Sequence, residues 1–177
     1  PRFLADAHLG RLARYLRLLG FDTRYGNDPG DRALAELSVA EHRILLTRDR
    51  ALLMRREITH GCYIRAGRPL AQLAYVLERC DLQRLMRPFT RCMKCNAPLQ
   101  QVSKAEVLEQ LLPATRAHYE EFWRCCGCGQ VYWKGGTMLG CRSWCRACWS
   151  IPAPVQLSRI NPDGNSPFDC GSRFYNK

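Results

Sequence analysis

The first ninety residues alternate between two kinds of hydrophobic pattern. Short apolar runs predict strands at residues 3–6, 21–25, 44–47 and 63–64. Leucine and alanine at helical spacing predict helices at residues 9–19, 34–40, 52–53 and 69–80, with Asp31 placed to cap the second of them. Strands that alternate with helices in this way predict an α/β fold, in which helices flank a parallel sheet.

Acidic residues follow the predicted strands at the edge where such sheets bind ligands. Asp6 ends the first strand, Asp49 follows the third, and the turn with Asp28 and Asp31 lies on the same edge if the connections are right-handed. Carboxylates this close repel one another unless a cation joins them, and oxygen ligands favour Mg²⁺ or Mn²⁺. Such a site would suit phosphodiester hydrolysis. Alternatively, each aspartate only caps a helix or forms a turn. Asp22 fits the site less well because it falls inside a predicted strand.

The charge of the chain indicates a polyanionic partner. Of 177 residues, 27 are Lys or Arg and 16 are Asp or Glu, which gives a net charge of +11, and 23 of the 27 are arginine. The planar guanidinium matches phosphate oxygens, so this excess favours nucleic acid. Arg11, Arg14 and Arg17 recur every three residues and predict a basic ridge on the solvent side of the first helix, which either contacts phosphate or is simply solvated.

Length and apolar content limit the class of protein. Hydrophobic residues make up 46% and charged residues 24%, values typical of a globular protein with one core and a small second module. Apolar runs are far shorter than the roughly 20 residues that cross a bilayer, so we expect no membrane association. The start lacks a secretion signal, which predicts an intracellular protein in the cytoplasm or nucleus. It also lacks an initiator methionine, which is typical of a fragment of a longer chain.

The eleven cysteines gather in the second half of the chain, with only two before residue 90. Without a secretion signal, metal ligands and buried thiols are favoured over disulfides. Cys92 and Cys95, and then Cys125 and Cys128, form two Cys-x-x-Cys pairs that can together hold one Zn²⁺. Four thiolates close the coordination sphere, so this zinc would be structural. We expect Cys126 not to bind the metal, because the two-residue gap of a Cys-x-x-Cys pair favours Cys125 and Cys128 as the ligands.

The segment between the cysteine pairs is longer than in a minimal zinc ribbon. Residues 104–112 predict an inserted helix, and Ser103 with Glu106 predicts a capping box at its start. His118 could replace a thiolate, but a surface position on a helix fits it better. The aromatic residues near the second cysteine pair either stack on bases or fill a small core: Phe122, Trp123, Tyr132 and Trp133.

Residues 137–177 have no clear hydrophobic period. Their prolines and glycines predict an irregular, disordered tail. Four cysteines in it could form a second metal site, although their gaps are irregular: Cys141, Cys145, Cys148 and Cys170.

Several stretches together resemble a known family. They are residues 3–6, 9–14, 18–23, 45–49, 122–125 and 132–133. The chain resembles the PIN-like RNase domain with a zinc ribbon that forms the carboxy-terminal part of Mut-seven-type exonucleases. The resemblance covers about residues 2–136. It implies a PIN-like fold, metal-dependent RNase activity, and Asp6, Asp31 and Asp49 as the acidic cluster, with Asp28 as a further candidate.

The resemblance has a limit and a consequence. Similar sequences continue with Gly-Ser-His after the position of Trp133, whereas here Lys134 and two glycines follow, so that histidine is missing. The break would fit an alternative end of the transcript. The longer members of the family imply a separate 3′–5′ exonuclease domain upstream of Pro1.

We therefore expect three regions: a PIN-like nuclease domain at residues 1–90, a zinc ribbon at 91–136 and an irregular tail at 137–177. The predicted activity is hydrolysis of single-stranded RNA. Asp6 and Asp49, with Asp28, would coordinate Mg²⁺ or Mn²⁺, and Asp31 would complete the shell or orient water. The three ridge arginines and Arg48 would hold the RNA backbone. The alternatives are a nucleic-acid-binding module without chemistry, and a remnant that keeps only the fold.

Overall fold

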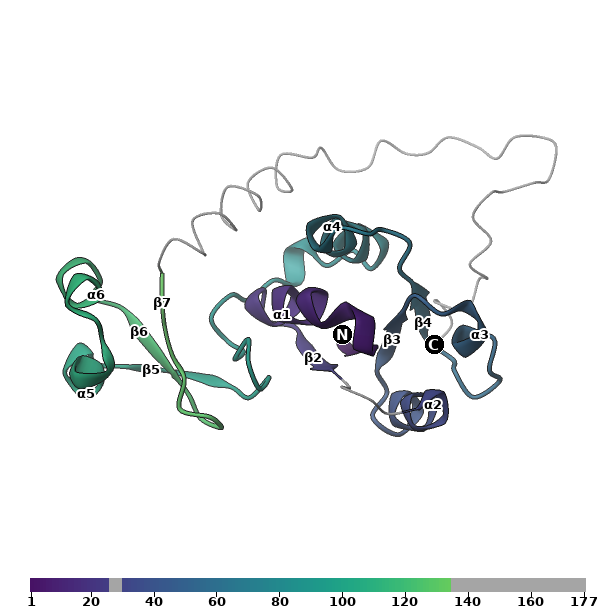
Figure 1. Cartoon of the computed structure of the whole chain (residues 1–177), viewed down its shortest axis with the longest axis horizontal. Coiled ribbons are helices and arrows are strands. Elements are labelled where there is room, and N and C mark those ends of the chain that lie inside the picture. The colour runs from purple at the N-terminus through teal and green to yellow at the C-terminus, as the bar shows by residue number, and fades with distance from the viewer. Residues whose placement is uncertain (26–29, 135–177) are drawn as a thin grey trace.

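A computed structural model describes residues 1–25 and 30–134, and its amino-terminal part is a parallel α/β sheet (Figure 1). The strands are β1 (Arg2–Ala5), β2 (Asp22–Tyr25), β3 (Ile44–Thr47) and β4 (Gly61–Tyr63). They are all parallel, in the order β2-β1-β3-β4. The helices are α1 (Gly10–Leu18), α2 (Asp31–Ala40), α3 (Arg50–Leu53) and α4 (Pro69–Arg79), with short 3-10 turns at Ala7–Leu9 and Gln83–Leu85. The predicted α/β class is confirmed.

Alternation along the strands gives the sheet two buried faces. Phe3 and Ala5 belong to the core that includes the apolar side chains of α1 and α4. Leu4 and Leu45 point to the other face and pack with the apolar side chains of α2 and α3. Helices therefore cover both faces of the sheet, and the carboxyl ends of the strands are left as an edge where loops can present polar groups.

Two of the predicted helices differ from the structure in ways that local chemistry explains. The α2 helix begins at Asp31 itself, so Gly30 holds the N-cap position and Asp31 lies in the first turn rather than capping the helix. The single helix expected at residues 104–112 is instead α5 (Lys104–Val107), a 3-10 turn (Leu108–Gln110) and, after a break, α6 (Pro113–His118). Pro113 forces extended backbone on Leu112, whose ψ is 150°, and so separates the helices. The Ser103–Glu106 capping box is confirmed.

The second part is a three-stranded antiparallel ribbon. It contains β5 (Leu99–Val102), β6 (Phe122–Cys125) and β7 (Val131–Trp133), with β6 in the middle. The insertion with α5 and α6 lies between β5 and β6. Phe122 is fully buried in the small core of the ribbon, against which Trp133 packs. Trp123 stacks on Phe89 with ring centroids 4.3 Å apart, so these aromatics pack within the protein.

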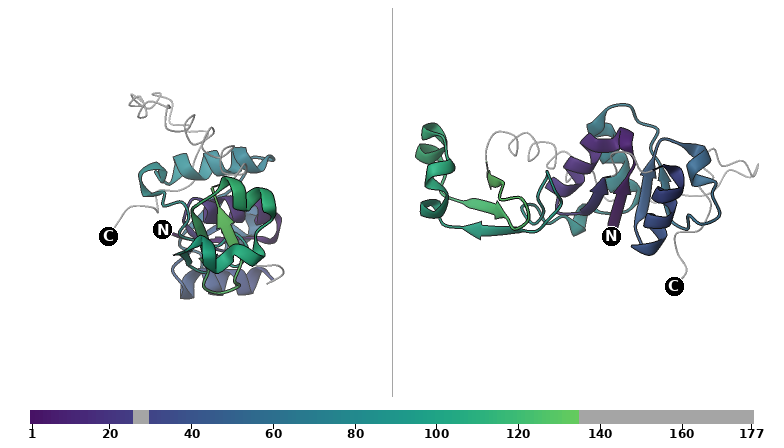
Figure 2. Two further views of the ribbon diagram at one scale, coloured as in Figure 1. Left: turned by 90° about the vertical axis from the view of Figure 1, so that its left-hand side faces the viewer. Right: turned by 60° about the horizontal axis from the view of Figure 1, so that its bottom comes forward.

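The ribbon extends from the β2 side of the sheet (Figures 1 and 2). Two backbone features secure the segment that leads to it. Gly20 has a φ of +92°, and a Cβ there would lie 2.1 Å from the carbonyl oxygen of Arg87. The amide of Arg87 donates to the carbonyl of Leu19 at 2.8 Å. The backbone at the end of α1 is thus in direct contact with the backbone of Arg87, in the segment that leads to the ribbon, and only glycine fits at position 20.

The predictions for residues 137–177, including a second metal site, concern residues outside those described. Among the described residues, the helices are too short and too polar to cross a bilayer.

Candidate functional site

Two aspartates lie beside each other at the carboxyl ends of β1 and β3. The amide of Asp6 donates to the carbonyl of Leu46 at 3.0 Å, which places Asp6 next to Thr47, the last residue of β3. The Thr47 hydroxyl donates to Oδ2 of Asp6 at 2.8 Å and accepts from the amide of Asp49 at 2.9 Å. A fully buried threonine hydroxyl therefore connects the Asp6 carboxylate to the backbone of Asp49.

Both carboxylates also accept hydrogen bonds from the turn that follows them. Oδ1 of Asp6 accepts from the amide of Ala7 at 2.5 Å, and Oδ1 of Asp49 accepts from the amide of Ala51 at 2.7 Å. Each carboxylate thus caps the first turn of a helix. An ionised carboxylate has about four lone-pair positions, so these bonds leave acceptor capacity for a cation. One or two carboxylates with phosphate oxygens are the usual Mg²⁺ donors, and this pair fits that set.

The other two predicted acids have different placements. Asp31 is exposed at the start of α2, and Asp28 lies outside the described residues. Within residues 1–25 and 30–134, the aspartates do not form a group of three or more side chains close enough to share a metal ion. The Thr47 hydroxyl thus connects the carboxylate of Asp6 with the backbone of Asp49, and Asp31, in the first turn of α2, is not part of these hydrogen bonds. Asp22 lies at the opposite end of its strand, where it pairs with Arg43 at 2.8 Å.

The basic ridge on α1 is only partly as predicted. Arg11 and Arg14 are exposed, and so is Arg48 beside the candidate acids. The solvent-side position predicted for Arg17 is wrong, because its side chain is only 7% exposed. It donates from Nε to the carbonyl of Thr23 at 2.8 Å and from Nη1 to two ribbon carbonyls, those of Met93 and Lys94. Every third helical position drifts by about 60°, so the third arginine of the series turns toward the ribbon.

Two features near the acids were missed from the sequence. Thr47 stands two residues before Asp49, a spacing at which a hydroxyl often bonds nearby backbone, and this signal was available. At the end of β4, the Tyr63 ring packs under the guanidinium of Arg50, which lies 5.0 Å from the ring centroid. The pair of Tyr63 and Arg50 does not follow from sequence spacing, because α3 and β4 are separate in the chain. Arg65, two residues after Tyr63, lies 5.9 Å from the centroid of the same ring.

The four cysteines of the two predicted pairs form the second cluster. All four sulfurs of Cys92, Cys95, Cys125 and Cys128 lie within 4.8 Å of one another. Two of the sulfur separations are 3.6 Å and 3.3 Å, close to the value of about 3.8 Å expected around a tetrahedral Zn²⁺ with Zn–S bonds of about 2.3 Å. Cys126 is exposed and outside the cluster. Four soft donors in this geometry could bind a metal such as zinc.

The protonation of these thiols supports the same assignment. Burial opposes ionisation of Cys92, but the Tyr132 hydroxyl and nearby backbone amides donate to its sulfur and lower its pKa to about 6. Burial and the neighbouring thiols raise the pKa of Cys95 to about 12. One thiol ionises readily while the next resists, because adjacent negative sulfurs repel. A divalent cation at the centre would let all four ionise.

Comparison with known families agrees with this fold and these clusters. The family model for the Mut7-C RNAse domain matches residues 1–143. The chain belongs to the Mut7-C RNAse domain family, and is thus a ribonuclease-type domain. No curated protein and no solved structure gave a significant match. The predicted resemblance is confirmed.

Proposed function

We propose that this chain is a metal-dependent ribonuclease domain that hydrolyses phosphodiester bonds in single-stranded RNA. The observation that carries the proposal is the Asp6–Thr47–Asp49 arrangement at the carboxyl ends of two adjacent parallel strands. These two carboxylates lie at the ligand-binding edge of the sheet, where a divalent cation would balance their charges. The basic surface would at the same time attract RNA.

The roles of the residues follow from their contacts. A Mg²⁺ or Mn²⁺ ion at Asp6 and Asp49 would activate water and stabilise charge on the phosphate oxygens. Thr47 holds the Asp6 carboxylate in place through its hydroxyl. Arg48 is exposed between Thr47 and Asp49 and would contact a phosphate of the RNA. No side-chain nucleophile is needed.

The remaining predicted residues take supporting roles in this proposal. Asp31, with Asp28, would complete the metal shell or orient the attacking water once RNA is bound. Arg11 and Arg14 would contact the RNA backbone from α1. The cysteine cluster would hold a structural Zn²⁺, since four thiolates leave no open position for substrate.

The wider context belongs to the proposal as well. The family resemblance supports a place in a larger 3′–5′ exonuclease, with the exonuclease domain upstream in the same chain. We place the protein in the cytoplasm or nucleus, where thiols stay reduced. Cys92, Cys95, Cys125 and Cys128 lie close together as thiols without a disulfide between them, which suits such a compartment.

A second candidate function is a nucleic-acid-binding module without chemistry. One observation favours it: Asp6 and Asp49 each already cap a helix, a structural role that needs no metal. In that case the ribbon and the arginines would supply affinity, and the acids would serve only the fold.

Cleavage of end-labelled single-stranded RNA, with Mn²⁺ added or omitted, separates the two functions. We expect cleavage only with Mn²⁺, and its loss in the double variant Asp6→Asn, Asp49→Asn. Asparagine keeps the capping oxygen and removes the charge, so the fold should survive. The product ladder would show whether cleavage starts at an end. Intact RNA with zinc-loaded, folded wild type would favour the binding module.

A further inference from the structure

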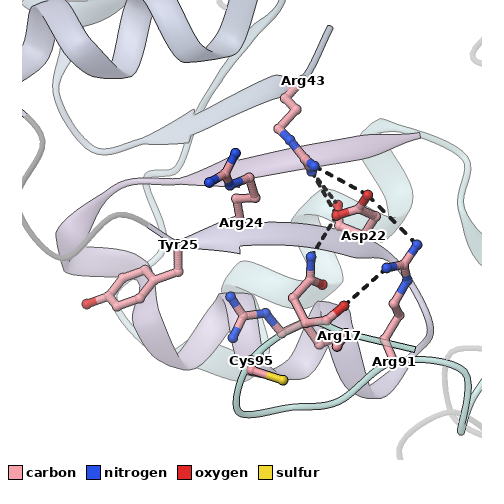
Figure 3. Close-up of a pocket in the computed structure, with 9 residues that line it drawn as sticks. Arg17, Asp22, Arg24, Tyr25, Arg43, Arg91 and Cys95 are labelled. Atoms are coloured by element: carbon pink, nitrogen blue, oxygen red, sulfur yellow. Dashed lines mark hydrogen bonds and ion pairs between the residues drawn. The ribbon is translucent and has the colours of Figure 1, made fainter. Parts of the chain in front are cut away.

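A pocket of about 430 Å³ lies where the ribbon meets the outer edge of β2 (Figure 3). Four arginines from separate segments line it, together with one carboxylate. The arginines are Arg17 from α1, Arg24 from β2, Arg43 before β3 and Arg91 from the start of the ribbon. Asp22 is the single acid among the lining residues.

The charge of Asp22 is already balanced within the protein. Figure 3 shows its carboxylate between Arg43 and Arg91. Oδ1 accepts from Nη1 of Arg43 at 2.8 Å and from Nδ2 of Asn96 at 2.7 Å, and Oδ2 accepts from Nη2 of Arg43 at 3.3 Å. Burial opposes ionisation, but these hydrogen bonds outweigh it and hold the pKa of Asp22 below its ordinary value. Asp22 thus fixes the pocket wall, and its charge is shared chiefly with Arg43 and more weakly with Arg91.

Two of the arginines lie nearer to solvent than the other pair. The side chain of Arg24 is 49% exposed and pairs with Glu41, which does not line the pocket. Arg91 is 31% exposed, lies 3.8 Å from Asp22 and donates from Nη1 to the carbonyl of Asn96. Exposed ion pairs are weak, so an entering anion can replace Glu41 at Arg24 while Glu41 keeps its ion pair with Arg43. Phosphate suits the guanidinium fork best.

Tyr25 connects this pocket to the candidate acids. It lines the pocket from the carboxyl end of β2, and its hydroxyl donates to the carbonyl of Ala7 at 2.7 Å. Ala7 directly follows Asp6 and donates its own amide to that carboxylate. The pocket wall and the Asp6 turn are therefore joined by one side chain.

We propose that the Arg24–Arg91 pocket binds a backbone phosphate of the RNA. This rests on the proposed function for the identity of the ligand, but not on catalysis. The ribbon would then take part in RNA binding directly, because Arg91 and Asn96 belong to it.

Binding of a labelled single-stranded RNA, followed by fluorescence anisotropy at several salt concentrations, tests the pocket. Neither Mg²⁺, Mn²⁺ nor chelator is added, so that RNA stays intact and zinc stays bound. The test variant is Arg24→Gln with Arg91→Gln. The control is Arg32→Gln with Arg56→Gln. Both arginines are exposed and lie outside the pocket, so these substitutions remove the same amount of charge elsewhere. Arg24→Gln alone, at an exposed position, serves if the double variant loses stability.

We expect the pocket variant to bind about 10-fold more weakly than the control, and the single variant to lie between them. The slope of log affinity against log salt should become shallower by about 0.7 for each phosphate of a single strand that the variant no longer neutralises. Equal affinity and slope in pocket and control variants, with matched unfolding midpoints and zinc content, would overturn the proposal even if the protein cleaves RNA. Weakened binding in the pocket variant of a protein that never cleaves would support the pocket and refute the nuclease.

Discussion

The Thr47 hydroxyl is the single group that links the two candidate metal ligands. It donates to Asp6 and accepts from the amide of Asp49, and it is fully buried. This hydroxyl therefore adds to the backbone amides of Ala7 and Ala51 that also hold the two carboxylates. The sequence indicated both aspartates from their positions after apolar runs. It did not indicate the hydroxyl between them, since hydrogen bonds between strands depend on register.

Thr47→Val keeps the shape of this side chain and removes the hydroxyl. We expect a loss of about 1 kcal/mol in the free energy of unfolding, the usual net value of one hydrogen bond. RNA cleavage should fall through kcat rather than KM, because Asp6 loses its orientation while the RNA-binding arginines remain. Thr47→Ser, which keeps the oxygen, should restore most of the activity. Wild-type kinetics in Thr47→Val would show that the hydroxyl positions nothing.

Asp22 should make stability depend on pH. Its pKa is lower in the folded state, so its contribution is complete above the ordinary carboxyl pKa of about 3.9 and is lost as pH falls through the folded value. Asp22→Asn should therefore be less stable than wild type by about 1–2 kcal/mol at pH 7. Urea unfolding at several pH values should show this gap closing below about pH 4. A gap that stays constant with pH would contradict the assigned ion pair with Arg43.

At the scale of elements, the turn between α1 and β2 determines how the ribbon segment is attached. Gly20 adopts a left-handed conformation against the backbone of Arg87, and the carbonyl of Leu19 accepts from the Arg87 amide. Arg17 and Asn96 add side-chain hydrogen bonds across the same junction. The end of one helix is thus the attachment point for a segment some seventy residues away.

Gly20→Ala should destabilise the protein by at least about 2 kcal/mol. The left-handed backbone alone costs about 1–2 kcal/mol for alanine, and the new Cβ would overlap the Arg87 carbonyl. Gly67→Ala is the matched control, since no atom lies within 4 Å of the added Cβ and φ is not positive. Denaturant unfolding followed by circular dichroism measures both. Similar midpoints for the two variants would refute the close contact at Gly20.

Elements were predictable from the sequence where local pattern determines them. The run at residues 44–47 is β3, and Pro69 begins α4. The inserted helix predicted at residues 104–112 stops before Pro113, because the residue before a proline avoids helical backbone. The second helix, α6, which begins at Pro113, was not predicted. The burial of Arg17 could not be predicted, since a periodic pattern does not show which neighbouring segment covers a helix flank.

At the scale of the whole molecule, the cysteine cluster secures more than the ribbon. The turn around it contains the carbonyls of Met93 and Lys94, which bind Arg17, and Asn96, which binds Thr23 and Asp22. These hydrogen bonds hold the turn against β2 and against the arginines of the pocket. Sequence spacing predicted the four cysteines because each pair is local, but not the pocket, whose walls come from segments far apart in the chain.

Cys125→Ser should lose one equivalent of zinc relative to wild type and lower the melting temperature, because the site loses one of its four ligands. Cys126→Ser should keep both, since Cys126 lies exposed outside the cluster. Metal content by mass spectrometry and thermal unfolding measure the pair. Equal zinc content in the two variants would exclude the assigned ligand set.

The most direct test of the proposed metal site compares the rate of Mn²⁺-dependent RNA cleavage by Asp49→Asn with the rate by Asp81→Asn. Asp81 lies beyond α4 with a φ of 47°, a conformation that asparagine accepts well, so this control removes the same charge without strain. The metal is expected to supply several kcal/mol of transition-state stabilisation, so Asp49→Asn should cleave at least about 100-fold more slowly. Asp81→Asn should match the wild type. Undiminished cleavage by a folded Asp49→Asn protein would contradict the assignment of the metal site.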